Sequence, residues 1–294
     1  MANSIFETLE KLNLTSTKTR KLFSNKTRDI ENIDVWKDEV SGVIYIDNFY
    51  TGDQTYIDGA YRKKNNSLDL QSIPEFEHSI DADRRLKNNL KFVKGKRIAD
   101  FGCGNGKFLQ LVNEHCSSVV GIELQESCIK SLNSIGIKCI NNLFKLEDKS
   151  IDAVVSFHVI EHLPDPIATL SNIREKIVSG GEILIEVPHA NDFLLSFAAN
   201  EKFKQFTLWS QHLILHTKES LRLILEASGF KNINVNGIQR YPLSNHLNWL
   251  TYGKAAGRKS SFSIIDTPAL NNEYESSLDQ VDATDTLVAI AKVS

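Results

Sequence analysis

Three glycines within five residues, in the segment "DFGCGNG", constrain the fold more than any other feature of the sequence. They are Gly102, Gly104 and Gly106, and they follow an apolar run that ends at Asp100. Glycine adopts positive φ angles without strain and lets a ligand approach the backbone where a Cβ atom would block it. In open α/β sheets, glycine turns between a strand and a helix bind nucleotide-like ligands. We therefore expect a ligand site at residues 100–106.

The segments around this loop alternate between strand-like and helix-like patterns. Apolar runs suited to strands alternate with helical patterns of about ten residues between positions 96 and 238. Such alternation predicts parallel β-α-β units with right-handed crossovers. The segment "TLVAIAKV", residues 286–293, predicts one more strand. The sequence thus favours an α/β protein with a mostly parallel sheet.

Two kinds of segment depart from this alternation. We assign residues 1–75 to an N-terminal extension that contains a short helix and a β-hairpin. The domain that carries the glycine loop then spans residues 76–294. An aromatic-rich insert at 189–216 and a second insert at 241–283 interrupt that domain.

The composition narrows the class of partner. Lysine and arginine number 34 against 37 acidic residues, and the net charge of -3 provides no general attraction to nucleic acids. We expect a small-molecule acceptor instead. The four cysteines form no C-x-x-C pair, which argues against a disulfide framework or a zinc knuckle and favours a reduced, cytoplasmic protein. The sequence has no apolar run of the length that spans a bilayer and no signal-peptide pattern.

Two nucleotide-type ligands suit a glycine loop at this place. A dinucleotide would use the pattern G-x-G-x-x-G, which needs a small residue at Lys107 so that the helix packs close to the strand. Lys107 therefore argues against NAD. The other ligand is S-adenosylmethionine, and a tight turn that binds no ligand is the purely structural alternative.

The segments "DFGCGNG" and "SFHVIEHLPDP", residues 156–166, resemble two motifs of the class I S-adenosylmethionine-dependent methyltransferases. The second is similar to the motif of the subgroup with ubiquinone-biosynthesis O-methyltransferases and bacterial sugar methyltransferases. The pattern "WSQHLILHTKESLRLILEASGF" resembles the same subgroup. The resemblance implies a Rossmann-like, seven-stranded, mostly parallel sheet whose last strand, residues 286–293, is antiparallel. It also implies S-adenosylmethionine as the cofactor and S-adenosylhomocysteine as the product.

The resemblance also implies which residues bind the cofactor. Glu123 ends the second strand, where the acid of this family holds the ribose hydroxyls, and a carboxylate can accept both O–H donors. Asp100 would fix the loop and the amino group of the methionine part. Asn142 stands where the family often has an aspartate that contacts the adenine amino group. The expected cofactor-binding set is Asp100, Gly102, Cys103, Gly104, Glu123, Leu124, Asn142 and His158.

Two histidines are candidate catalytic residues. His158 follows the apolar run "AVVSF" and is expected over the methyl-transfer position, either as a general base or packed against the cofactor. His212 lies in the aromatic-rich insert, where it either faces an acceptor pocket or caps the surface. We expect Glu161 and His162 to brace the loop by hydrogen bonds. His158 and His162 would need a third ligand to hold a metal, so we predict no metal site.

The expected acceptor site combines the aromatic-rich insert with the residues that follow the sixth strand. Trp209 would provide an apolar wall that excludes water. Arg240, Tyr241 and His246 form a polar and aromatic cluster that suits a sugar or a phosphorylated sugar. The same composition is common at dimer interfaces, so a homodimer is the other interpretation of this cluster.

The predicted function is methyl transfer from S-adenosylmethionine to a small molecule. The segment "GIQRYPLSNHLNWLTYGKAAGRK" resembles methyltransferases encoded beside bacterial surface-polysaccharide genes. This resemblance favours O-methylation of a sugar or sugar-linked intermediate, such as a nucleotide sugar, in polysaccharide biosynthesis. The alternatives are N- or C-methylation of another small metabolite and a cofactor-binding scaffold without turnover.

Overall fold

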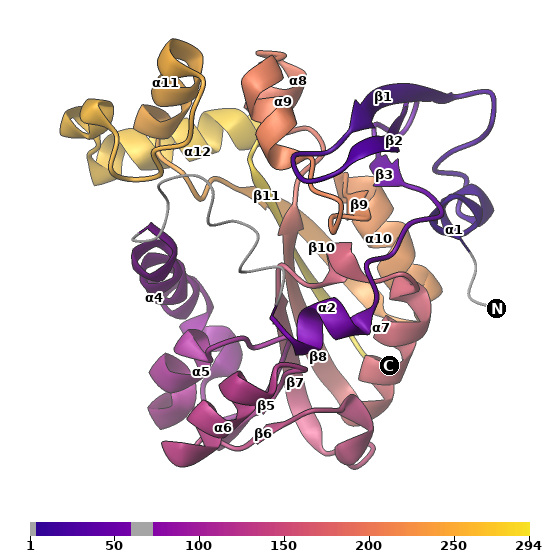
Figure 1. The fold of residues 1–294 in the computed structure, drawn as a ribbon. Coiled ribbons are helices and arrows are strands. Elements are labelled where there is room, and N and C mark those ends of the chain that lie inside the picture. Colours follow the sequence, from indigo (N-terminus) through magenta and orange to yellow (C-terminus); the bar gives the residue numbers. More distant parts are fainter. Residues whose placement is uncertain (1–3, 60–72) are drawn as a thin grey trace.

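The computed structural model describes residues 4–59 and 73–294 (Figure 1). Its central sheet contains seven strands: β4 (Arg97–Phe101), β5 (Ser118–Ile122), β6 (Cys139–Ile140), β7 (Ile151–Phe157), β8 (Ile177–Pro188), β10 (Lys231–Ile238) and β11 (Thr286–Lys292). The strand order is β10-β11-β8-β7-β4-β5-β6. The pairs from β8 to β6 are parallel, whereas β11 pairs antiparallel with both β8 and β10. This sheet confirms the seven-stranded, mostly parallel architecture that the sequence predicts.

Helices cover both faces of the central sheet. Val154 of β7 lies in a buried core with residues of α7 (Pro166–Lys176) and α10 (Lys218–Ala227). Val155, its neighbour, lies in a second core with residues of α4 (Ile73–Val93) and α5 (Lys107–Val112). Successive side chains of a strand point to opposite faces, so a strand covered on both sides is a continuous apolar run in the sequence. Three shorter helices follow α5, β5 and β6: η2 (Asn113–His115), α6 (Glu126–Ser134) and η3 (Leu143–Lys145).

The N-terminal segment contains more than the expected helix and hairpin. After α1 (Ile5–Lys11), the strands β1 (Arg20–Lys26), β2 (Glu31–Asp38) and β3 (Ile44–Ile46) form a sheet with β9 (Ile214–Leu215), in the order β1-β2-β3-β9. The antiparallel pair of β2 and β3 confirms the hairpin. Neither β1 nor β9 is predicted from the sequence. β1 is an edge strand without a fully buried residue, so it lacks the apolar alternation that marks a strand.

Two regions that are separate in the sequence therefore build one small sheet. β9 belongs to the aromatic-rich insert, and its Leu215 pairs with Ile44 of β3. Val35 of β2 shares a buried cluster with Leu208 of the insert. In Figure 1 the three indigo strands lie beside β9 at the side of the central sheet. The N-terminal segment is thus attached to the insert where the sequence predicts an acceptor pocket.

The remaining helices lie at the edges of these two sheets or connect them. They are α2 (Asp53–Ile57), η4 (Ile160–His162), α8 (Phe193–Ser196), α9 (Glu201–Thr207), α11 (Leu243–Tyr252), η5 (Ser261–Ile265) and α12 (Pro268–Gln280). Within residues 4–59 and 73–294, no helix combines the length and the apolar character needed to cross a bilayer.

Candidate functional site

The glycine loop leaves β4 and turns back over the end of β5. The backbone N–H groups of Gly102 and Cys103 both donate to the carbonyl oxygen of Ile122, at 2.8 and 3.2 Å. Gly102 has a φ of 79°, and a Cβ atom there would lie only 2.4 Å from a methyl carbon of Val159. An L-side chain would meet both backbone strain and a collision at this position. The glycine is therefore required by the close approach of the segment that follows β7.

Glu123 is tied to this loop by its carboxylate. One oxygen accepts the N–H of Gly104 at 2.7 Å, and the other accepts the N–H groups of Leu124 and Gln125 at 2.8 and 2.9 Å. An ionised carboxyl has about four acceptor positions, so one remains for a ligand. Three backbone donors fix the acid at the end of β5, directly beside the glycine loop.

Asp100 lies below the loop with an unsatisfied oxygen. Its side chain is 2 % exposed, and Oδ1 has no hydrogen-bond partner among residues 4–59 and 73–294. Burial raises the pKa of Asp100 to about 7, the negative charge of Glu123 adds to this rise, and Arg85 opposes it. A buried acceptor without a donor is costly unless a ligand supplies one. The amino group of S-adenosylmethionine is a suitable donor, so Asp100 and the glycine loop fit this cofactor.

The other expected cofactor residues lie at neighbouring strand ends. Asn142 follows β6, and its side chain caps η3 by accepting the N–H of Phe144 at 2.9 Å. Leu124 and Phe144 expose apolar surface after β5 and β6, which are adjacent strands. Cys103 belongs to the loop itself, and its Sγ is 3.9 Å from that of Cys139.

His158 follows β7 in a left-handed conformation, with a φ of 56°. Its Nε2 accepts a hydrogen bond from Nη1 of Arg240 at 2.9 Å, and its Nδ1 lies 3.4 Å from a carboxyl oxygen of Glu161. Burial, together with the charge of Arg240, holds the pKa of His158 well below its usual value. The imidazole is thus neutral, but the lone pair of Nε2 is already used. In this arrangement His158 orients its neighbours and has no free nitrogen for a base.

Arg240 occupies a buried ionic network that the sequence analysis misses. Its guanidinium pairs with Asp81 of α4, and Arg85 of the same helix pairs with Glu186 of β8 at 2.8 Å. Burial opposes the ionisation of Asp81, but the charge of Arg240 overrides it and lowers the pKa of Asp81. Arg240 is therefore committed to protein partners rather than open to a phosphate. The signal in the sequence is a set of charges in α4 at the spacing of one helical face, residues 81, 84 and 85.

Tyr241 and His246 do not form an open cluster with Arg240. The Nδ1 of His246 lies 2.5 Å from the hydroxyl of Tyr274, and its ring stacks on Phe193 with centroids 5.8 Å apart. The ring of Tyr241 lies 5.4 Å from the guanidinium carbon of Arg240. His246 is 2 % exposed, so its contacts are internal ones.

Glu161, His162 and His212 converge from η4 and the aromatic-rich insert. His162 donates from Nδ1 to the carbonyl oxygen of Gln211 at 2.8 Å, and its Nε2 is 3.9 Å from Glu161. Within the part of the chain that the structure describes, both carboxyl oxygens of Glu161 lack a hydrogen-bond partner. The expectation that Glu161 braces the loop by side-chain hydrogen bonds is therefore wrong, because its neighbours are imidazoles in poor hydrogen-bond geometry.

The same three side chains provide the donor set that the sequence analysis does not find. One ligand atom from each of Glu161, His162 and His212 lies within 4.8 Å of the others, so the group has the composition of a metal site. Burial lowers the pKa of His162 to about 4 and that of His212 well below its usual value, and the charge of Arg28 adds to both effects. A nearby guanidinium also disfavours a second cation. That the protein holds no metal stays a prediction from the sequence.

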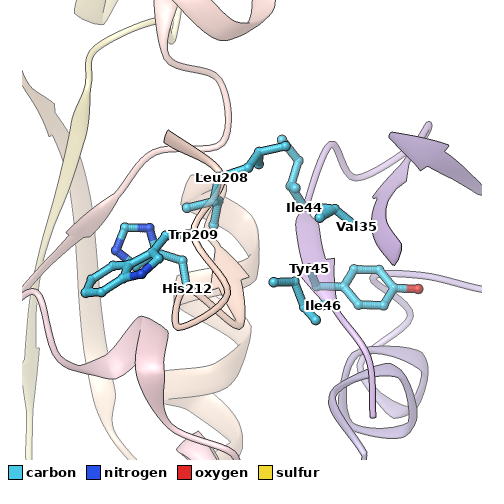
Figure 2. A pocket seen from close by; sticks show the side chains of 8 residues that line it. Val35, Ile44, Tyr45, Ile46, Leu208, Trp209 and His212 are labelled. Atoms are coloured by element: carbon cyan, nitrogen blue, oxygen red, sulfur yellow. The ribbon is translucent and has the colours of Figure 1, made fainter. Parts of the chain in front are cut away.

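Trp209 and His212 lie between the small sheet and the side chains of Glu161 and His162. Their ring centroids are 5.3 Å apart, and His162 lies 5.1 Å from His212. Figure 2 shows both rings turned away from Val35 and Tyr45, across an apolar space that also adjoins Leu208. These side chains leave no room for a water molecule between the insert and the small sheet. The ring of His162 also lies 5.8 Å from that of Trp209, so the three rings form one group.

A segment of the N-terminal region also reaches the site. The ring of Tyr56 in α2 lies 6.0 Å from that of His162. A Cβ atom on Gly59 would lie 2.7 Å from the amide nitrogen of Gln125, two residues after Glu123. The end of α2 thus lies between the Glu123 region and the imidazoles.

Comparison with known proteins agrees with this geometry. A family model described as a methyltransferase domain matches residues 77–235, which is more than half of the chain. The chain belongs to this methyltransferase family. S-adenosylmethionine is accordingly its cofactor, and the glycine loop, Glu123 and the unsatisfied Asp100 are the features of the structure that fit it.

Individual relatives and structures are more distant. The chain is 27% identical over 173 residues to a ubiquinone biosynthesis O-methyltransferase of Idiomarina loihiensis, covering 54% of this chain and 71% of the relative. It is 28% identical over 170 residues to a tRNA U34 carboxymethyltransferase of Alteromonas mediterranea, covering 51% and 49%. The match to the structure of an S-adenosylmethionine-dependent methyltransferase from Archaeoglobus fulgidus covers 73% of this chain and 94% of that protein's chain. Its TM-score is 0.51, and the two sequences are 22% identical. The last comparison supports the fold alone.

Proposed function

We propose that this protein transfers the methyl group of S-adenosylmethionine to a hydroxyl group of a small acceptor. The observation that carries the proposal is the contact between Gly102 of the glycine loop and Val159, where a Cβ atom would lie 2.4 Å from the valine methyl. Val159 stands between His158 and Glu161, so the cofactor loop and the imidazole group are adjacent. A methyl donor and a proton acceptor need this proximity to react on one acceptor atom.

We assign the cofactor to the residues that the loop brings together. The carboxylate of Glu123 takes a ribose hydroxyl with its remaining acceptor position, and Asp100 takes the amino group. Gly102 and Gly104 leave the backbone open to the ligand, with Cys103 between them. Leu124 would cover the adenine ring, and Asn142 would lie near its amino group. When bound, S-adenosylmethionine supplies a methyl carbon that an oxygen can attack.

The protein's own groups then hold the acceptor and its proton. We assign Trp209 to the wall of the acceptor site, where an apolar ring would exclude water from the reacting oxygen and make that oxygen more reactive. His212 is neutral because burial lowers its pKa, and its Nδ1 has no hydrogen-bond partner among the described residues. His212 is therefore our candidate base. His158, whose Nε2 is occupied by Arg240, orients the group and contacts the cofactor.

We rank the classes of acceptor differently from the expectation of a sugar that the sequence favours. The ion pair between Arg240 and Asp81 removes the guanidinium that a phosphorylated sugar would need. The relatives are named for ubiquinone biosynthesis and tRNA modification, and their names give no support to polysaccharide synthesis. We therefore place phenolic hydroxyls first and sugar hydroxyls second. We also retain the cytoplasm as the compartment of this reaction.

Two measurements test the proposed function. Calorimetry with S-adenosylmethionine, S-adenosylhomocysteine and NAD should show binding of the two sulfur compounds and no binding of NAD. Isotope-labelled S-adenosylmethionine is then offered with catechol, UDP-glucose, ethanolamine and unmodified tRNA. Transfer to catechol supports the proposal, and transfer to UDP-glucose restores the sugar assignment. Transfer only to the amine or the tRNA contradicts hydroxyl transfer to a small acceptor.

One variant separates the alternatives. An amine acceptor needs no general base, so His212→Ala would retain most of the activity if nitrogen is methylated. Tight cofactor binding without product from any acceptor would indicate a scaffold. If neither S-adenosylmethionine nor S-adenosylhomocysteine binds, the proposed function is overturned altogether.

A further inference from the structure

The turn between β1 and β2 is bonded to the aromatic-rich insert on both sides of Trp209. The backbone N–H of Arg28 donates to the carbonyl oxygen of Leu208 at 2.8 Å. The carboxylate of Asp29 accepts the N–H and the hydroxyl of Ser210, at 3.0 and 2.7 Å. These bonds join the turn to the two neighbours of Trp209 in the sequence. The turn is thus fixed against the residue that we assign to the wall of the acceptor site.

The side chain of Arg28 lies over the ring of Trp209. The guanidinium carbon is 4.4 Å from the ring centroid of Trp209 and 5.6 Å from that of Phe206. A cation over an aromatic face is attracted by the negative charge of that face, so the stacking holds the guanidinium in place. The ring of Trp209 in turn lies 5.8 Å from that of His162 and 5.3 Å from that of His212. Arg28 therefore borders the group of rings where we place the acceptor.

The charge of Arg28 forms no ion pair with an acid of the described residues, although Asp29 is its neighbour in the sequence. Both oxygens of Asp29 accept hydrogen bonds from Ser210 instead. The guanidinium makes one long hydrogen bond, at 3.4 Å to the carbonyl oxygen of Phe206, and Arg28 is exposed. Arg240, by contrast, is paired with an acid inside the protein. Because a guanidinium has five N–H donors, most donors of Arg28 are left for a ligand.

The shape and charge of a guanidinium indicate the kind of group that it binds. Its N–H donors form a planar fork that fits a carboxylate through two parallel hydrogen bonds. Its single positive charge also balances the single negative charge of a carboxylate. Arg28 lies outside residues 77–235, which match the methyltransferase family. This position suits a role in the choice of acceptor, because the cofactor residues lie within the matched part.

We propose that Arg28 determines the acceptor by binding a carboxylate, so that the substrate is a small hydroxylated carboxylic acid. This inference rests on the proposed function, because it concerns the acceptor whose hydroxyl group is methylated. Trp209 has two roles in this arrangement, since it is a wall of the site and the support of the guanidinium. Arg28 takes no part in the transfer of the methyl group. Its contribution is therefore expected in KM rather than in kcat.

The test compares acceptors that differ only in the presence of a carboxylate. 3,4-Dihydroxybenzoate is paired with 3,4-dihydroxybenzamide, and glucuronate is paired with glucose, with isotope-labelled S-adenosylmethionine as the methyl donor. For the pair that the wild-type chain methylates, we expect kcat/KM to be about 10-fold higher for the acid, the size of one hydrogen bond to a charged group. The difference should lie in KM.

Three substitutions of Arg28 separate binding from support of the tryptophan. In Arg28→Gln the KM of the acid should rise about 10-fold to that of the neutral acceptor, while kcat and the KM of the neutral acceptor stay within about twofold. Arg28→Lys should retain part of the preference, because it keeps the charge but not the fork. Arg28→Glu should prefer the neutral acceptor. If Arg28 only kept Trp209 in place, Arg28→Gln would raise both KM values equally.

Arg20→Gln is the matched control. Arg20 belongs to β1 of the same small sheet, and its guanidinium carbon is 4.4 Å from the ring centroids of both Trp36 and Phe6. It makes the same kind of contact as Arg28 with different rings. This variant should keep the wild-type preference for the acid. Calorimetric titration with S-adenosylhomocysteine shows that each variant is folded.

The outcomes separate this inference from the proposed function. A wild-type chain that methylates hydroxyl acceptors without preferring the acid would overturn the role of Arg28 alone. A preference for the acid that remains in Arg28→Gln would overturn it as well. If the wild-type chain binds S-adenosylmethionine but methylates neither pair nor catechol, the proposed function and the role of Arg28 are overturned together.

Discussion

The cofactor side of the site and its acceptor side are built in different ways. The cofactor side, from Asp100 to Asn142, is one continuous run of strands, loops and helices at the end of the central sheet. The acceptor side combines η4 with Trp209 and His212 of the insert, Arg240 after β10, and Tyr56 of α2. The first side is held by local backbone hydrogen bonds. The second is held by contacts between side chains far apart in the sequence.

This difference separates cofactor binding from acceptor recognition. Glu123 is fixed by three N–H groups, two from the residues next to it and one from the loop. His158 is fixed by Arg240, which depends on Asp81 across 159 residues of chain. Substitutions outside the cofactor side should therefore have little effect on the binding of S-adenosylmethionine. Substitutions in several distant elements should affect the acceptor side. Each of the following variants tests one part of that contrast.

The largest effect on cofactor binding is expected for Glu123→Ala. It removes the acceptor of the ribose hydroxyl and frees the N–H groups that order the loop, and a hydrogen bond to a charged group contributes about 1.5–3 kcal/mol. We expect the affinity for S-adenosylmethionine to fall at least about 100-fold by calorimetry. Glu126→Ala is the control, because Glu126 is exposed and pairs with Lys130 at 3.0 Å on the next helix. Equal affinities for the two variants would contradict this assignment.

Asp81→Asn should destabilise the acceptor side most. It leaves the buried guanidinium of Arg240 without its partner, and breaking such a pair costs about 3–5 kcal/mol. Because the folded pKa of Asp81 is lowered, the pair stabilises the wild type above the usual aspartate pKa of about 3.9 and is lost as the pH falls. Denaturant unfolding of Glu219→Gln, at an exposed pair with Arg222, should show a loss below about 1 kcal/mol. If both variants lose a similar free energy of unfolding, the pair of Asp81 and Arg240 does not behave as a buried ion pair.

Glu161→Gln should change how stability depends on pH. The unfolded chain ionises Glu161 above its usual pKa, whereas the folded protein keeps the proton to about pH 8. Wild-type stability is therefore lost as the pH rises through this window, at about 1.4 kcal/mol per unit. We expect the variant to gain about 3 kcal/mol on the wild type between pH 5 and pH 8 in unfolding titrations. The exposed Glu126→Gln should show no such gain, and a constant difference for Glu161→Gln would refute the raised pKa.

Two glycine variants should give the smallest difference. Gly102 and Gly136 have φ angles of 79° and 81°, so alanine adds about 1–2 kcal/mol of backbone strain at either. At Gly136 no atom of the described residues lies within 4 Å of the added Cβ, whereas at Gly102 Val159 does. Gly102→Ala should cost about 1–3 kcal/mol more than Gly136→Ala in thermal unfolding. Equal costs would mean that Val159 moves aside and that the loop and the His158 segment are not closely packed.

The sequence predicts the cofactor side because its determinants are local. The glycines of the loop, Glu123 and the alternation of strands and helices all follow from patterns within a few tens of residues, and the sheet confirms the fold. The sequence also predicts that glycine is needed at Gly102. The cause in the structure is the approach of Val159, which belongs to the motif at residues 156–166.

The acceptor side is predicted only in part because its contacts are long-range. The pairing of Arg240 with Asp81 and that of β3 with β9 join elements that no local pattern connects. The short β9 and the largely exposed β1 carry too little apolar pattern to be recognised. Glu161 is recognisable as part of a motif, but its lack of hydrogen bonds is visible only in the folded protein.

A crystal structure with bound S-adenosylhomocysteine would test the central claim that the two sides share one reaction chamber. The position of the sulfur atom is the quantity to measure. The account predicts the ribose at Glu123, the amino group at Asp100, and the sulfur facing the group of His158, Glu161 and His212. A sulfur atom that faces away from these side chains, or a cofactor bound elsewhere, would contradict the account.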